Sequence, residues 1–175
     1  KINEHLEVSG RLSNIHSDGY VDRAFTDLKS YFLQGSYNDE NTLIKAISFG
    51  GAERTYQSWY GLDLQQLKED RRQNPYTYEN EVDDYKQNHY QLHWNEQINS
   101  RWSTNLGLNY TKGAGFFEQF KADENAVDFN NLIEDGSDVI VRRWLDNDFY
   151  VLNFNTNYKD EKINLISGIS YSNYT

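Results

Sequence analysis

The chain has 175 residues, a formal net charge of −10 and no cysteine. The acidic balance argues against nucleic acid as a partner, because phosphate binding needs a clustered basic surface, and the lack of cysteine excludes disulfide frameworks and thiolate sites. Fourteen Tyr beside one Pro and no Met favour strands, and no run approaches the roughly 18 apolar residues of a membrane helix.

Seven stretches alternate apolar and polar residues, which is the period of a strand with one apolar face. Their apolar members, in chain order, are Leu6, Val8, Gly10 and Leu12; Tyr31, Leu33, Gly35 and Tyr37; Leu43, Ile47 and Phe49; Tyr90, Leu92, Trp94 and Ile98; Trp102, Leu106, Leu108 and Tyr110; Tyr150, Leu152, Phe154 and Tyr158; and Ile163, Leu165, Ile169 and Tyr171. We therefore predict an all-β fold, an antiparallel meander of about seven strands, with residues 1–175 as a single segment.

The links between these stretches alternate between long and short. In outer-membrane barrels the short turns all lie on the periplasmic side and the long loops all lie outside the cell. The short links are Asn38–Asn41, Asn99–Arg101 and Asp160–Lys162, and the long ones are Ser17–Asp27, Tyr56–Tyr85 and Ala114–Asp148. The pattern predicts a sheet that crosses a membrane.

Aromatic residues on the apolar face concentrate near both ends of the strands. Tyr37, Trp102 and Tyr158 lie beside short links, and Tyr31, Tyr90, Tyr110, Tyr150 and Tyr171 lie near long ones. Trp102 and Tyr110 are eight steps apart, about 26 Å along a strand or about 20 Å after tilting. Barrels have an apolar band about 25 Å tall between aromatic girdles, so we expect these residues to form two girdles. The polar faces are rich in Asn, Ser, Gln, Gly and His, which suits a hydrated lumen.

Seven strands do not close a bacterial barrel, which uses even numbers from 8 upward. The chain also begins and ends within strand-like sequence, at Lys1 and Thr175. We therefore expect a piece of a larger barrel.

The order of several segments resembles the barrel of TonB-dependent outer-membrane receptors, particularly those of Bacteroidetes. The segments that carry the resemblance are residues 10–24, 27–31, 49–59, 74–76, 84–92 and 144–150. The resemblance implies a 22-stranded transmembrane β-barrel in the bacterial outer membrane, a plug domain inside it, and energised import through contact with TonB. The plug and about two thirds of the strands are not among these residues, so the implied function belongs to the parent receptor.

Family members import ferric siderophores, haem, cobalamin or glycans, and we expect an iron chelate (a siderophore or haem) or a similarly bulky nutrient here. Outer-membrane lipid and, through the plug, TonB are the expected partners, with no nucleic acid and no cofactor. The alternative is a soluble β-sandwich that binds carbohydrate through exposed aromatic residues. No catalytic constellation is present, and we predict that the chain is not an enzyme.

Aromatic and basic residues in the long links are the candidates for ligand contact, because aromatic rings stack on sugars and flat chelates and Arg pairs with anionic groups. The candidates are Tyr56, Trp59, Tyr60, Arg71, Arg72, Tyr76, Tyr78, Phe116, Phe117 and Phe120. Packing of the links against one another explains the same residues equally well.

No metal site is expected. His89 and His93 point the same way on a strand, but they lie roughly 13 Å apart, too far to share an ion. The acidic residues of the long links lack the spacing of an EF-hand loop, so we expect Glu79, Glu81 and Asp83 to belong to a solvated surface.

Overall fold

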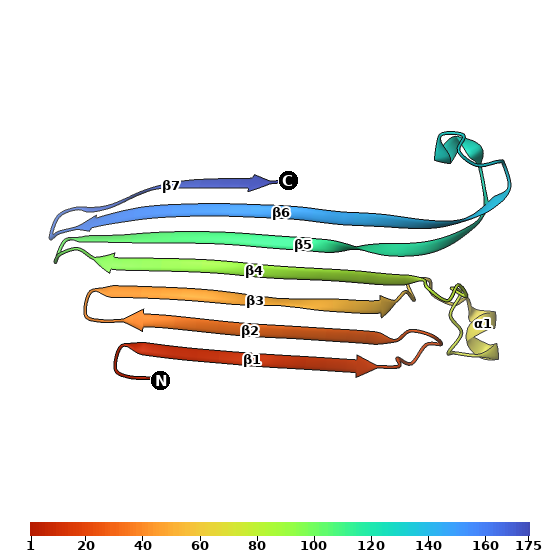
Figure 1. The fold of residues 1–175 in the computed structure, drawn as a ribbon, viewed down its shortest axis with the longest axis horizontal. Helices are drawn as coiled ribbons and strands as arrows, with labels where there is room; N and C mark the ends of the chain where they lie inside the picture. Colours follow the sequence, from red (N-terminus) through yellow and green to blue (C-terminus); the bar gives the residue numbers. More distant parts are fainter.

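The structure, a computed structural model, describes residues 1–175 as one seven-stranded antiparallel sheet whose strands follow the chain order, β1 to β7 (Figure 1). The elements are β1 Leu6–Ser17, β2 Thr26–Asn38, β3 Thr42–Tyr56, α1 Leu64–Glu69, β4 Val82–Gln97, β5 Trp102–Glu124, the 3-10 helix η1 Ala126–Phe129, β6 Ser137–Lys159 and β7 Asn164–Tyr174. The predicted all-β meander is confirmed. Neither helix has the length and apolar character needed to cross a membrane.

All three short links lie at one end of the sheet and all three long links at the other (Figure 1). Each short link is a turn organised by one Asp or Asn whose side-chain oxygen accepts two backbone N–H groups, as turn-forming Asx residues commonly do. The organising residues are Asp39, Asn99 and Asp160, and the N···O distances lie between 2.8 and 3.1 Å.

A fourth turn of this kind precedes β1. Asn3 Oδ1 accepts from the backbone N–H groups of His5 and Leu6 at 2.9 and 2.7 Å. The backbone bond from Asn3 to the carbonyl of Leu6, 3.3 Å, matches the bond from Asn99 to the carbonyl of Trp102, also 3.3 Å. Residues 2–6 therefore repeat the geometry by which the sheet reverses direction at its short-link end.

The register separates the side chains into two faces, because residues paired across antiparallel strands lie on the same side of the sheet. We call apolar face the side that carries the rows Leu92–Leu108–Leu152 and Trp94–Leu106–Phe154. We call polar face the side that carries the rows Asn95–Asn105–Asn155 and Gln91–Asn109–Val151.

The predicted facing of the third stretch is wrong. Leu43, Ile47 and Phe49 pair with Asn95, Gln91 and His89, so they lie on the polar face, and Phe49 stacks on the His89 ring at 4.5 Å. Strand β3 has apolar residues on both sides, and its own pattern does not fix its facing. Its register is set by β2 and β4, whose patterns are stronger, and a slip by one residue would move every side chain to the other face.

The predicted third long link, Ala114–Asp148, is also wrong, because most of it is strand. Strands β5 and β6 have 23 residues each, and the link between them is only residues 125–136. Phe116 faces Trp144 across the two strands with ring centroids 4.8 Å apart, and pairing continues to Lys121 and Val139. Aromatic and β-branched cross-strand pairs stabilise such a ladder; apolar residues on both faces hide its alternation.

A close approach between β4 and β5 explains two glycines. The Tyr85 ring lies over Gly113 and Gly115, where an added Cβ would come within 2.0 Å of the tyrosine oxygen and 2.2 Å of a backbone oxygen of Asp84, respectively. The Tyr85 hydroxyl then donates to Asn147 Oδ1 on β6 at 3.1 Å. One side chain thereby links three strands on the polar face.

Candidate functional site

Buried residues are rare and gather at the long-link end. Nine of the 175 residues are buried, and both faces of the sheet are otherwise open. Six of the nine surround the link between β3 and β4, namely Tyr56, Gln57, Asn74, Glu81, Val82 and Glu118. This end is the one place where the chain builds a compact interior.

The link between β3 and β4 is held down by polar contacts with the link between β1 and β2. The Asn74 side chain donates to the backbone oxygens of Gln57 and Asp22 at 3.1 and 3.0 Å. Arg23, with a left-handed φ of 64°, donates to the backbone oxygens of Tyr76 and Asn74 at 2.7 and 3.1 Å. The two links therefore form one unit.

A chain of polar contacts joins this unit to β5 and β6. The Tyr56 hydroxyl donates to the backbone oxygen of Tyr78 at 2.5 Å, and the Tyr78 hydroxyl donates to Glu118 Oε1 at 2.6 Å. Arg142 donates from Nε to Glu118 Oε2 at 2.7 Å, and its Nη2 lies 2.6 Å from the same oxygen. The hydrogen bond from Tyr78, followed by those from Arg142, holds the pKa of Glu118 below its ordinary range.

Glu81 corrects the expectation that the acidic residues of this link are solvated, because it is 1% exposed. Its Oε2 accepts the backbone N–H of Phe120 at 3.2 Å, but its Oε1 has no partner. Burial is the main cause that raises the pKa of Glu81. Gln57 beside it is equally buried, and its Nε2 also has no partner. Asp83, also expected in the link, lies on β4.

The aromatic candidates form separate pairs. Trp59 and Tyr60 are 62% and 67% exposed; Tyr60 lies 5.2 Å from Tyr76, and Trp59 lies 6.4 Å from Phe117. Tyr78 lies 6.1 Å from Phe120. Trp59, Tyr60 and Tyr76 remain able to meet a ligand, whereas the other contacts are packing.

Other candidates are placed differently from the expectation. Tyr56 is buried, and its hydroxyl is used within the link. Phe116, Phe117 and Phe120 are residues of β5, not of a loop. Phe116 lies under the Arg142 guanidinium at 4.4 Å.

The two arginine candidates also differ. Arg72 lies 3.6 Å from Asp22 as an ion pair, while Arg71 is exposed in the turn after α1.

The sequence did not predict four members of this interior, namely Glu81, Gln57, Glu118 and Arg142. Nothing in the local pattern distinguishes Glu81 from the exposed Glu79 two residues earlier.

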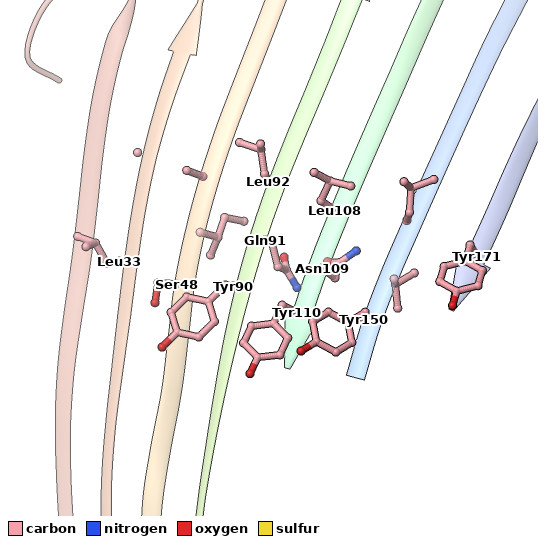
Figure 2. A pocket seen from close by; sticks show the side chains of 15 residues that line it. Leu33, Ser48, Tyr90, Gln91, Leu92, Leu108, Asn109, Tyr110, Tyr150 and Tyr171 are labelled. Atoms are coloured by element: carbon pink, nitrogen blue, oxygen red, sulfur yellow. The ribbon is translucent and has the colours of Figure 1, made fainter. Parts of the chain in front are cut away.

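Aromatic side chains lie toward both ends of the strands on the apolar face. Tyr90, Tyr110 and Tyr150 stack side by side across β4, β5 and β6, with centroids 5.9 and 4.8 Å apart, next to the row of leucines (Figure 2). At the other end Trp102 and Tyr158 are 4.9 Å apart. Tyr37 and Tyr158 donate to the turn residues Asp39 and Asp160, both at 2.8 Å.

The remaining predicted girdle residues, Tyr31 and Tyr171, lie one row to either side of the stacked tyrosines, Tyr31 toward the long-link end and Tyr171 toward the leucines. Beyond the stacked tyrosines, the first charged side chains are Lys112 and Asp148, which lie in the same cross-strand row as Tyr31. Lys112 Nζ donates to Asp148 at 2.9 Å and also contacts Asp146, and the Tyr110 hydroxyl donates to Asp148 at 2.6 Å. The apolar band is therefore bounded on this side by tyrosines and then by ions.

The histidines of the polar face take part in local hydrogen bonds. His89 Nδ1 lies 2.9 Å from Thr111 Oγ1, and His93 Nε2 lies 3.4 Å from Gln91 Oε1. No group of three or more His, Asp or Glu side chains converges as metal ligands do.

Comparison of the chain with protein-family models, with curated proteins and with solved structures found no match. A functional proposal for this chain therefore depends on its own sequence pattern and on the arrangement of its side chains.

Proposed function

We propose that residues 1–175 are part of the wall of a TonB-dependent outer-membrane receptor, a 22-stranded barrel that imports an iron chelate or a similarly bulky nutrient. The observation that carries the proposal is an uncovered apolar band on one face of a single-layered sheet, bounded by three stacked tyrosines at one end and by the Trp102–Tyr158 pair at the other.

The apolar face needs an apolar environment. Leu92, Leu108, Leu152 and Phe154 lie on β4, β5 and β6 between the aromatic residues at the two ends of the band, and each is 36–41% exposed. Every square ångström of apolar surface left in water costs about 25 cal/mol, and a sandwich would cover this face with a second sheet. All seven strands belong to one sheet, which favours lipid as the covering medium.

The polar face suits a hydrated lumen. Its side chains bond one another across strands: the Asn105 amide donates to Asn95, and Ser170 donates to Asn153 at 2.6 Å. Barrel strands alternate apolar residues facing lipid with polar residues facing the interior. In the parent receptor this face would meet water and the plug, and the plug would contact TonB.

The orientation follows from the links. In a bacterial barrel the short turns lie at the periplasmic end. In the proposed orientation the turns at Asp39, Asn99 and Asp160 therefore face the periplasm, and the link that carries Trp59 and Tyr60 faces the outside of the cell. Exposed aromatic rings at the outer end are suited to stack on a flat chelate or on a sugar ring.

The edge strands β1 and β7 each pair with a neighbour on one side only, and the turn at Asn3 favours a further strand beside β1. Its two hydrogen bonds repeat those of the three hairpins. We expect a strand before Lys1 to pair with the free edge of β1, as closure of a barrel requires.

Site-directed labelling tests the proposal, because the native chain has no cysteine to interfere. Leu108→Cys and Asn109→Cys are neighbours on opposite faces of β5 and form a matched pair. In the full protein, reconstituted into vesicles, a spin label at position 108 should collide with oxygen dissolved in lipid and be shielded from a water-soluble nickel chelate. The label at position 109 should show the reverse. Equal access of the nickel chelate to both labels would contradict the proposal and favour a soluble protein.

A further inference from the structure

A groove of about 610 Å³ crosses β1 to β4 on the apolar-face side of the sheet. It lies beyond the row of Tyr90, Tyr110 and Tyr150, toward the long-link end. Lys29 of β2 and Lys86 of β4 line it, and both pair with Ala52 of β3 in one cross-strand row. Two strand spacings separate their Cα atoms by about 10 Å. Because Ala52 has only a methyl side chain, it leaves space between the two lysines. The ammonium groups of Lys29 and Lys86 can therefore both reach a single ligand placed above Ala52.

The wall of the groove nearest the tyrosine row is polar. The Tyr31 hydroxyl donates to Asn88 Oδ1 at 3.0 Å and lies 3.2 Å from Ser48 Oγ. This contact uses the acceptor atom of Asn88 and leaves the amide nitrogen as a donor. The groove therefore offers two cations and a neutral donor, and Tyr31 and Asn88 hold each other in place.

The charges of Lys29 and Lys86 are not neutralised within the chain. Neither lysine takes part in an ion pair, although the chain carries a net charge of −10. Lys112, one row closer to the tyrosines, is by contrast paired with both Asp146 and Asp148. The next row away from the tyrosines carries Asp27, which is bound to His16 at 2.5 Å, and Asp84, with Arg54 between the two aspartates.

We propose that this groove binds a phosphate group of an outer-leaflet lipid, with Lys29 and Lys86 on either side of it. The inference rests on the proposed function, which places this face against lipid and this end outside the cell. Lys86 lies four residues beyond Tyr90 on β4, about 13 Å along the strand or about 10 Å along the membrane normal. A lysine side chain directed back toward the bilayer lowers its ammonium group from this height to the level of the headgroups. The headgroups extend several ångströms beyond the hydrocarbon core.

The experiment compares the full protein with a Lys29→Gln/Lys86→Gln variant and with a Lys159→Gln/Lys162→Gln control. The control removes the same charge from the short-link end of the sheet. Each protein is placed in nanodiscs of phosphatidylcholine that contain either diphosphoryl lipid A or dephosphorylated lipid A, and native mass spectrometry measures the lipid retained. Inorganic phosphate is added in a separate arm.

We expect the wild type and the control to retain diphosphoryl lipid A, and the Lys29→Gln/Lys86→Gln variant to bind it about 30-fold more weakly, since each basic residue at an anionic surface contributes roughly a factor of five. Dephosphorylated lipid A should not distinguish the three proteins. Equal retention by all three inserted proteins overturns the groove proposal alone, as does full competition by inorganic phosphate. A wild-type protein that fails to enter nanodiscs overturns the proposed function as well.

Discussion

Two glutamates within the same small interior have pKa values shifted in opposite directions. Glu118 is stabilised as a carboxylate by Tyr78 and Arg142, whereas Glu81 is buried with one oxygen unpartnered. The carboxylate of Glu118 therefore stabilises the fold above the ordinary Glu pKa of 4.5 and ceases to do so as the pH falls through its lowered value. Ionisation of Glu81 does the opposite: it costs stability as the pH rises above 4.5.

Glu81→Gln should raise the free energy of unfolding by about 1 kcal/mol at pH 8, because it removes a buried negative charge and keeps an oxygen for the N–H of Phe120. The gain should shrink toward pH 4, where Glu81 is protonated in both states. Urea unfolding of the full protein in detergent, followed by tryptophan fluorescence, measures both values. Glu79→Gln, at an exposed position, is the control. A gain that does not vary with pH would contradict the assigned cause.

Arg142→Gln should lower the free energy of unfolding by about 1 kcal/mol at pH 7, a modest value because the arginine itself is half-exposed. The loss should diminish as the pH falls and Glu118 becomes protonated. The same unfolding assay across the pH range checks the prediction. A loss as large at pH 3 as at pH 7 would show that Arg142 acts through its contact with Phe116 instead.

The hairpin turns are the elements whose chemistry repeats. Asp39 and Asp160 accept backbone N–H groups, and these bonds are the largest cause that lowers the pKa of each carboxyl below 3.8. Asn99 occupies the same position without a charge. Two of the three turns should therefore weaken as the pH falls below about 4, and the third should not.

Asp39→Asn/Asp160→Asn should make the sheet less sensitive to acid, because an amide oxygen accepts the same bonds at every pH. Hydrogen exchange of the amide groups in the turns, measured at pH 3 and pH 6, tests the prediction. The turn at Asn99 serves as the internal control. If the double variant loses protection at pH 3 as strongly as the wild type, ionisation of the two aspartates is not the cause.

The strands and their order could be predicted from alternation, and the turns from Asp and Asn beside short links. The facing of β3 could not, because Ile44 and Ile47 give it apolar residues on both sides and its neighbours decide. The length of β5 and β6 could not either, since Phe116 and Phe117 are adjacent and break the alternation. At the site, the exposure of Trp59 and Tyr60 was foreseeable from their place in a polar link. The burial of Glu81 depends on contacts between segments distant in sequence.

For the molecule as a whole, the decisive property is that its single sheet has one apolar and one polar face, and that no second sheet covers either of them. Leu106 lies midway between Trp102 and Tyr110, the two ends of the apolar band on β5. A charge at this position is placed near the middle of the hydrocarbon layer in the proposed orientation, while a charge at Asn105 is placed in the lumen.

Leu106→Arg should reduce the amount of folded protein in the outer membrane, because an arginine facing lipid at the midplane costs about 2–4 kcal/mol. Asn105→Arg should be tolerated. The yield of heat-modifiable, protease-resistant protein in isolated outer membranes distinguishes the two variants. Equal yields would indicate that the apolar face does not contact lipid.

The length of β5 and β6 has a consequence for where a ligand is first met. From Tyr110 to Glu124 strand β5 continues for another 14 residues, about 46 Å along the strand or about 35 Å along the membrane normal at a tilt of ~40°. A paired hairpin of this kind is a stiff projection, not a flexible loop. In the proposed orientation its tip, with η1, would stand well above the bilayer, so a ligand would be met there first and would then approach the membrane along a fixed β-surface.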